Sequence, residues 1–173
     1  PGDVQWMTSG CGILHEEMPR RGPNGVVNGF QLWVNLPAVQ KMSAPRYQEV
    51  NAASIPGLVQ DGARVRVVAG EHGGIRGAVV DIAARPLYID VTLQPGSEFA
   101  VQTPPGNTVL AYVYEGAGDF GLDGDRPGER VEAVKMLVVG DGDHLRARAD
   151  AESSVSFMLI AGAPFREPIV PYG

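Results

Sequence analysis

Alternation of apolar and polar residues, broken by glycine- and proline-containing turns, constrains the fold of this 173-residue chain most strongly. Every second residue is apolar in 30–36 and 87–93, and valine alternates with arginine in 64–67. A period of two puts one set of side chains on a core face and the other outward, which predicts β-strands. Further strand-like runs are 109–115, 136–139, 145–149 and 155–161, and we expect Leu110, Phe157, Leu159 and Ala161 to lie in the core with the apolar residues of 87–93. With 23 Gly and 14 Pro spaced as turn signals, the sequence predicts an antiparallel all-β sandwich or barrel, with short helix-like stretches such as 47–54.

Composition narrows the function classes. Hydrophobic residues make up 44% of the chain and charged residues 20%, which favours a buried core over a disordered chain. No apolar run approaches the roughly 20 residues that span a membrane. Residues 61–173 carry sixteen acidic and ten scattered basic residues, so no basic stripe predicts direct binding to nucleic acid. The single cysteine, Cys11, excludes an internal disulfide and fits a reducing compartment.

A weak internal repeat predicts two tandem β units. The turn at Gly2-Asp3 leads to a strand, a loop and the apolar run 30–34, and the turn at Gly142-Asp143 leads similarly to 157–161. We expect residues 1–60 to form the latter half of a first unit plus a linker, and 61–173 a closed second unit. Strand signals precede the Gly-Asp turn only in the second unit, so we expect the first unit to be incomplete in this chain.

The motif that carries chemistry is a glycine-rich turn, Gly10-Cys11-Gly12, followed by His15 and Glu17. Residues two apart on a strand share a face, so His15 and Glu17 would point into a barrel while Glu16 points outward. An imidazole and a carboxylate on one face suit Fe(II) or another hard or borderline divalent ion. Because the same spacing often occurs on strands without any metal, the motif alone leaves both interpretations open.

Six segments occur in one order along the whole chain: PGDVQWMT at 1–8, GILHEEMP at 12–19, GFQLWVNL at 29–36, PRYQE at 45–49, LYID at 87–90 and LIAGAPFREP at 159–168. Together they resemble the signature segments of the pirin family. The resemblance implies a cytoplasmic or nuclear bicupin, built from two cupin β-sandwich or barrel units. It also implies one iron in the N-terminal cupin, held by three histidines and a glutamate. Bacterial members of the family resemble quercetin 2,3-dioxygenases, and animal members act as iron-dependent transcription co-regulators.

The resemblance places His15 and Glu17 on the third and fourth ligand positions of the iron. The first two ligands, a His-x-His pair, precede Pro1 in the family and are absent from this sequence. Asn28 stands where family members often have histidine. In the second unit, Gln102 and Pro104 occupy the positions of a cupin His-x-His pair, so we expect no metal there.

The remaining candidate residues have competing interpretations. We expect His72 to be a loop residue rather than part of a phosphate site, and His144 to lie at or near the surface. Cys11 fits a turn better than a redox sensor. Trp6 and Trp33 fit the walls of a flavonoid pocket about as well as they fit core packing or a domain contact.

These observations lead to three functional hypotheses. The first is an Fe(II)-dependent dioxygenase acting on quercetin or a related flavonol, in which Glu17 takes the substrate's hydroxyl proton. The alternative is a non-catalytic, iron-dependent module that binds a regulatory protein, and the third is an inert structural fragment. With two ligands, we expect weak iron binding unless a second copy or a companion chain completes the first cupin.

Overall fold

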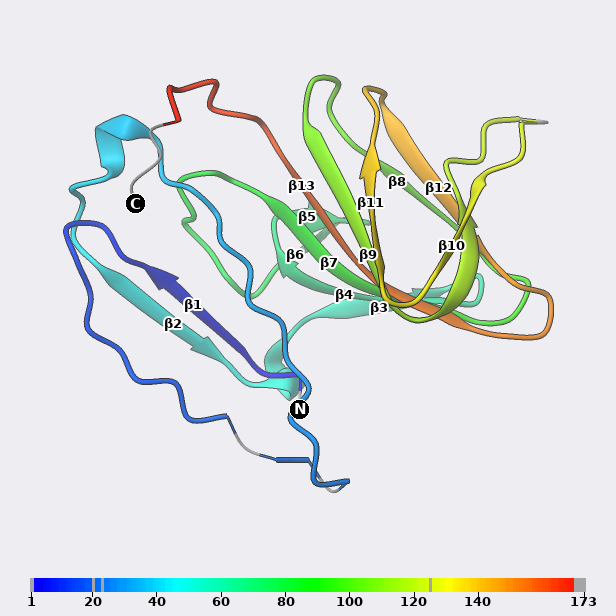
Figure 1. Ribbon diagram of the computed structural model, residues 1–173, viewed down its shortest axis with the longest axis horizontal. Helices are drawn as coiled ribbons and strands as arrows, with labels where there is room; N and C mark the ends of the chain where they lie inside the picture. Colours follow the sequence, from blue (N-terminus) through cyan, green and yellow to red (C-terminus); the bar gives the residue numbers. More distant parts are fainter. Residues whose placement is uncertain (1, 20, 23, 125, 170–173) are drawn as a thin grey trace.

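The computed structural model describes residues 2–19, 21–22, 24–124 and 126–169, and these residues are almost entirely β or irregular (Figure 1). This confirms the predicted all-β class. The helical elements in these ranges are two short 3-10 turns, η1 (Ala38–Gln40) and η2 (Ala52–Ser54). The strands are β1 (Val4–Thr8), β2 (Arg46–Val50), β3 (Gly57–Gln60), β4 (Ala63–Ala69), β5 (Glu71–His72), β6 (Ile75–Arg76), β7 (Leu87–Leu93), β8 (Glu98–Gln102), β9 (Thr108–Phe120), β10 (Glu129–Glu132), β11 (Lys135–Val139), β12 (His144–Ala149) and β13 (Val155–Gly162).

A curled nine-stranded sheet contains most of the C-terminal part of the chain. Its strands follow the order β3-β4-β7-β13-β9-β12-β8, with β10 and β11 on the other side of β9. Strand β9 spans 13 residues and pairs with β13 along its first half and with β12 along its second half. Gly116 lies between the two halves with φ of 74°, and a Cβ there would stand 2.0 Å from the carbonyl oxygen of Ser154. Only glycine fits this close approach, so Gly116 lets β9 take part in both halves of the sheet.

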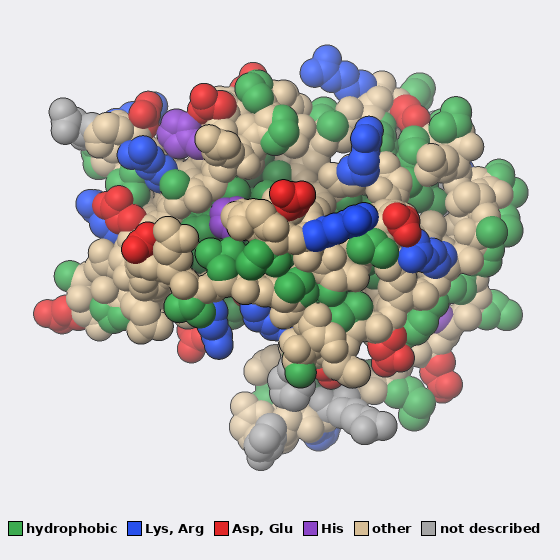
Figure 2. All heavy atoms as spheres, turned by 180° about the vertical axis from the view of Figure 1, so that it is seen from behind, with side chains coloured by type: hydrophobic (Ala, Val, Ile, Leu, Met, Phe, Trp, Pro, Cys, Tyr) green, Lys and Arg blue, Asp and Glu red, His purple; other side chains and the backbone are tan. Residues whose placement is uncertain are grey.

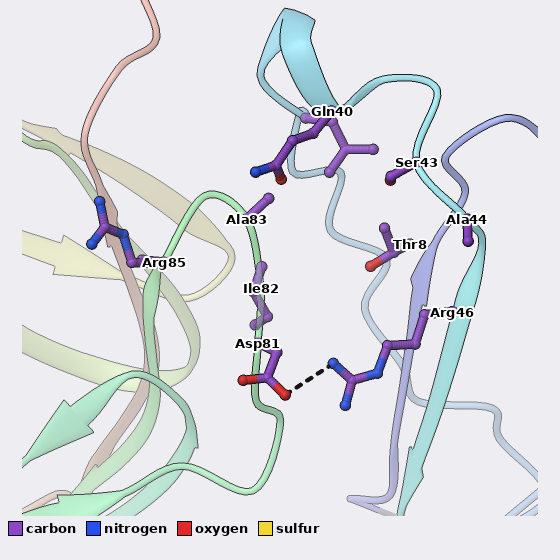
Figure 3. A pocket seen from close by; sticks show the side chains of 10 residues that line it. Thr8, Gln40, Ser43, Ala44, Arg46, Asp81, Ile82, Ala83 and Arg85 are labelled. Carbon is purple, nitrogen blue, oxygen red and sulfur yellow. Dashed lines mark hydrogen bonds and ion pairs between the residues drawn. The ribbon is translucent and has the colours of Figure 1, made fainter.

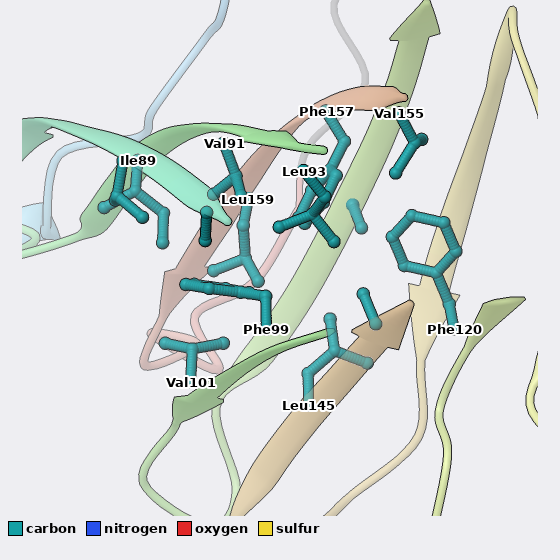
Figure 4. Packing of buried hydrophobic residues seen from close by; sticks show 14 of the residues in the cluster. Ile89, Val91, Leu93, Phe99, Val101, Phe120, Leu145, Val155, Phe157 and Leu159 are labelled. Atoms are coloured by element: carbon teal, nitrogen blue, oxygen red, sulfur yellow. The ribbon is translucent and has the colours of Figure 1, made fainter. Parts of the chain in front are cut away.

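The core fills the inside of the curl (Figure 4). The buried ring of Phe157 lies 6.1 Å from that of Phe99 and 5.0 Å from that of Phe120, centroid to centroid. Core positions predicted from the alternation are confirmed for Ile89, Val91, Leu93, Phe157, Leu159 and Ala161. Leu87 is half-buried at the edge of the same cluster. The prediction for Leu110 is wrong, since the inward residues of β9 are its neighbours Val109, Ala111 and Val113.

The sheet is curled rather than closed by a continuous hydrogen-bond ladder, which corrects the expectation of a closed second unit. Strands β3 and β8 are the two ends of the strand path, and each pairs with a single neighbour among the described residues. Side chains cover the core between β3 and β8 instead. In the β5–β6 hairpin the His72 ring lies 5.4 Å from the Phe99 ring, and Ile75 packs on the core beside Leu58. Short strands with a packed hairpin between them can therefore cover the core without a shared ladder.

The N-terminal part contributes one two-stranded ribbon, β1–β2, separate from the large sheet (Figure 1). Val4, Trp6 and Val50 of the ribbon pack on a second apolar cluster around Val68 and Val79. Trp6 therefore packs between ribbon and sheet. The helix-like interpretation of 47–54 is right only for 52–54, which form the 3-10 turn η2, because 47–50 belong to β2, where Tyr47 pairs with Met7.

The strands predicted at 30–36 and around His15 are not formed. Both stretches are extended or irregular, and among the described residues no neighbouring strand supplies a ladder for them. An alternating pattern predicts a strand only where another strand pairs with it. Division of the chain into units 1–60 and 61–173 stays a prediction, with its boundary in the turn between β3 and β4.

The surface mixes both signs of charge. On the face seen in Figure 2, Asp and Glu side chains are interspersed with Lys and Arg. Within the described residues, no helix has the length and apolar character needed to cross a membrane.

Candidate metal-binding segment

The segment that carries His15 and Glu17, residues 9–45, here called the metal-binding segment, begins at a fixed turn. The Cys11 amide donates to the carbonyl oxygen of Ser43 at 2.9 Å, and the Gly12 amide donates to that of Ser9, also at 2.9 Å. Gly10 has φ of 51°, and a Cβ on it would lie 2.1 Å from the Ser43 carbonyl oxygen. The sequence Gly10-Cys11-Gly12 therefore ties the start of the segment to the loop before β2.

The structure brings His15 and Glu17 together. The Nε2 atom of His15 lies 3.7 Å from Oε1 of Glu17, and the two side chains are 44% and 51% exposed. The predicted inside–outside contrast is not seen, because Glu16 and both its neighbours are exposed on an irregular segment. The two side chains are nevertheless within reach of each other.

Gln31 contacts Glu17, and the sequence did not predict this contact. Its side-chain amide donates a hydrogen bond to Glu17 Oε1 at 3.1 Å, across 14 residues of chain. The residue lies in the GFQLWVNL segment, but no sequence spacing indicates which side chain it meets. The contact became visible only through the path of the irregular segment.

The spacing of His15 and Glu17 fits two ligands of one ion. Bonds of about 2.0–2.2 Å to nitrogen and oxygen place neighbouring ligand atoms about 3–4 Å apart. No group of three His, Cys, Asp or Glu side chains able to hold a metal occurs in residues 2–19, 21–22, 24–124 and 126–169. Two protein ligands leave several coordination positions to water, so the pair fits part of an iron site, and its ligand role stays a prediction.

The other two histidines lie away from this pair. His72 is half-buried beside Phe99, and burial lowers its pKa below the ordinary value. His144 begins β12, where its Nδ1 lies 2.6 Å from Oδ1 of Asp143, and this hydrogen bond lowers the pKa of Asp143. His72 lies in β5 of a short hairpin rather than in a loop, and each of the two histidines has a local structural partner.

Two of the hollows formed by the described residues are large enough to hold a small molecule, and neither is lined by His15 or Glu17. The first, of about 530 Å³, lies between the β1–β2 ribbon and the loop 81–85, where Arg46 pairs with Asp81 at 3.3 Å (Figure 3). The second, of about 890 Å³, is lined by the β8 and β12 strands and includes Gln102, Pro104 and His144. Trp33 lines neither hollow and is 88% exposed, so the structure gives it no pocket or core role.

Comparisons with known proteins place this geometry in a family. Residues 88–173 match the Pirin C-terminal cupin domain family, and residues 1–34 match the Pirin family. Pirin-1 of Arabidopsis thaliana is 40% identical over 173 residues, which cover 99% of this chain and 58% of that protein. Pirin of Homo sapiens is 39% identical, with 100% of this chain and 58% of that protein covered.

The fold comparison agrees. A crystal structure of quercetin 2,3-dioxygenase from Acinetobacter baumannii has a TM-score of 0.81 and 34% identity to this chain, covering 99% of this chain and 59% of that one. The chain thus spans less than two thirds of the length of these relatives. Two family matches, relatives of about 40% identity and an all-β cupin fold agree, and the chain belongs to the pirin family.

Proposed function

We propose that this chain is part of an iron-dependent dioxygenase that acts on quercetin or a related flavonol. The observation that carries the proposal is the 3.7 Å approach of His15 Nε2 to Glu17 Oε1. The 34% identity to a quercetin 2,3-dioxygenase from Acinetobacter baumannii supports the reaction class. In this proposal His15 and Glu17 are iron ligands, and Glu17 is also the general base.

The two side chains have chemically distinct tasks. When bound, iron would supply a Lewis acid for the hydroxyl and carbonyl oxygens of the flavonol and a redox partner for O₂. Glu17 Oε1 accepts the Gln31 amide, while Oε2 makes no hydrogen bond with the described residues. That free oxygen is suited to take the proton of the substrate hydroxyl. Exposure of about half of each side chain leaves room for a substrate to reach them.

A second copy or a companion chain would complete the coordination. Apolar side chains in and just after η1 are strongly exposed, with Val39 at 93% and Met42 at 78%. Such side chains favour burial against another protein surface. We therefore propose a homodimer, or a pairing with a companion chain, through the N-terminal part, which light scattering tests by mass.

Oxygen consumption with quercetin and Fe²⁺ tests the catalytic proposal. We expect turnover that depends on assembly, is lost in Glu17→Gln and His15→Ala, and persists in Glu16→Gln. Glu16 is the matched control because it is exposed on the same segment and, within the part of the chain that the structure describes, forms no hydrogen bond or ion pair with His15 or Glu17. Turnover that survives both ligand substitutions would remove the proposal.

The alternative function is an iron-dependent module that binds a regulatory protein. Leu14 and Met18 flank the metal pair and are 102% and 77% exposed, which suits a protein contact beside the metal. Under this alternative, the assembled protein binds Fe²⁺ through His15 and Glu17 but consumes no oxygen with quercetin. The oxygen measurement therefore separates the two functions.

A further inference from the structure

One aromatic contact fixes the metal-binding segment to the C-terminal sheet. The Phe30 ring lies 5.5 Å from the ring of Tyr112 and 5.5 Å from that of Tyr114, centroid to centroid. Both tyrosines project from the outer face of β9, since the alternate residues Ala111 and Val113 are buried. Edge-to-face and tilted ring pairs at this separation are attractive. Phe30 is therefore an anchor between segments 82 and 84 positions apart in sequence.

Tyr114, one of the two tyrosines that contact Phe30, is itself held in place. The Tyr114 hydroxyl donates to Asp90 Oδ1 at 2.7 Å, and Arg66 Nη1 lies 3.4 Å from Asp90 Oδ2. Arg66 also donates to the carbonyl oxygen of Gly2 at 2.8 Å. Burial and the bond to Asp90 raise the pKa of Tyr114, so its hydroxyl remains a donor. Because Tyr114 is held in place, the Phe30 ring packs against a fixed partner.

Gln31, the residue after Phe30, forms a hydrogen bond with Glu17, the proposed general base. Gln31 is joined to Phe30 by one peptide bond, and its side-chain amide donates to Glu17 Oε1 at 3.1 Å. Because Glu17 lies on an irregular and exposed segment, neither ladder hydrogen bonds nor core packing define its position. The hydrogen bond from Gln31 therefore connects the Glu17 carboxylate to Phe30, which is packed against the C-terminal sheet.

We propose that Gln31 is a positioning residue for Glu17 and that Phe30, seated on Tyr112 and Tyr114, anchors it to the C-terminal sheet. The proposal rests on the proposed function, in which Glu17 is a metal ligand and base. It goes beyond that function, because it attributes the geometry of His15 and Glu17 to contacts with the C-terminal sheet, which carries no proposed ligand. Phe30 and Gln31 then affect metal binding without touching the metal.

The direct test is made on the metal-free protein at constant pH. The ¹³Cδ signal of Glu17 is compared in wild type, Gln31→Leu, Phe30→Ala and Trp33→Ala. We expect a changed signal in the first two variants and an unchanged one in Trp33→Ala, since Trp33 is exposed on the same segment. Phe30→Tyr keeps the ring and should restore the wild-type signal. Unchanged signals from the core residue Phe157 verify that each variant is folded.

A metal titration provides the second readout. With Mn²⁺ as the probe, loss of one positioning contact should weaken binding about fivefold in Gln31→Leu and Phe30→Ala, and less than about twofold in Trp33→Ala. A Glu17 signal that is identical in wild type, Gln31→Leu and Phe30→Ala would overturn the positioning role. If that signal responds while Mn²⁺ binding ignores His15→Ala, the positioning role stands and the proposed metal site fails.

Discussion

The curled C-terminal sheet and the segment from residue 9 to 45 contain the same alternating pattern, but only the sheet forms a strand from it. In β7 the apolar residues Ile89, Val91 and Leu93 are fully buried, and the strand pairs with neighbours on both sides. In 30–36 the pattern is equally regular, yet Phe30 is 56% exposed and the stretch forms no strand. Stability is concentrated in the first region, and the proposed chemistry lies in the second.

The comparison shows what alternation does and does not specify. A period of two fixes which side chains share a face, but burial requires a partner strand and an opposing layer. The sheet supplies both to β7 from β4 and β13. The segment 9–45 instead depends on a few discrete contacts, such as the turn at Gly10 and the ring contact of Phe30.

Removal of a core ring should have the largest effect. Phe157 is 0% exposed and packs against Phe99 and Phe120, so Phe157→Ala leaves a cavity at the centre of the sheet. We expect it to lower the free energy of unfolding by about 3–5 kcal/mol in urea denaturation. Trp33→Ala, at an 88% exposed position, should change it by less than about 0.5 kcal/mol. Equal losses would break the distinction between the two regions.

Two glycines allow the same substitution in both regions. Gly116→Ala places a Cβ 2.0 Å from a backbone oxygen inside the sheet, and Gly10→Ala places one 2.1 Å from a backbone oxygen at the start of the segment. We expect Gly116→Ala to cost about 1–3 kcal/mol of global stability. Gly10→Ala should leave the urea midpoint nearly unchanged while increasing amide exchange at Cys11, which donates to Ser43. A large midpoint shift in Gly10→Ala would mean that the segment unfolds together with the sheet.

The smallest predicted effect is the pH dependence from His72. Burial lowers its pKa, so the folded state binds fewer protons than the unfolded state below the ordinary value of 6.5. The stabilising contribution is present above 6.5 and is lost as the pH falls towards the lowered folded pKa. Between about pH 7.5 and about pH 5, the melting temperature of wild type should fall more than that of His72→Phe. Parallel curves for the two proteins would exclude this contribution.

Much of the fold could be predicted from local pattern. The strand-like runs at 87–93, 145–149 and 155–161 all lie within observed strands. Leu110 failed because an apolar residue can occupy either face of a strand, and its neighbours Val109 and Ala111 are the ones that face the core. The β1–β2 pairing was missed because the pairing register depends on contacts 46 residues apart, as between Val4 and Val50.

The candidate site was predictable only in part. The spacing of His15 and Glu17 indicated a shared site, and the structure brings their side chains within 3.7 Å without a strand. Gln31 could not be found in this way, because its contact with Glu17 depends on how an irregular chain folds back. The anchor on Tyr112 and Tyr114 likewise joins segments whose proximity no local pattern encodes.

The most direct measurement of the central claim, that His15 and Glu17 hold the metal, is paramagnetic broadening of amide NMR signals by Mn²⁺. Mn²⁺ accepts the same nitrogen and oxygen ligands as Fe²⁺, and broadening detects even weak binding. We predict selective broadening around His15, Glu17 and Gln31 that disappears in His15→Ala and remains in Glu16→Ala. Broadening centred on His72 or His144, or unchanged in His15→Ala, would contradict the account.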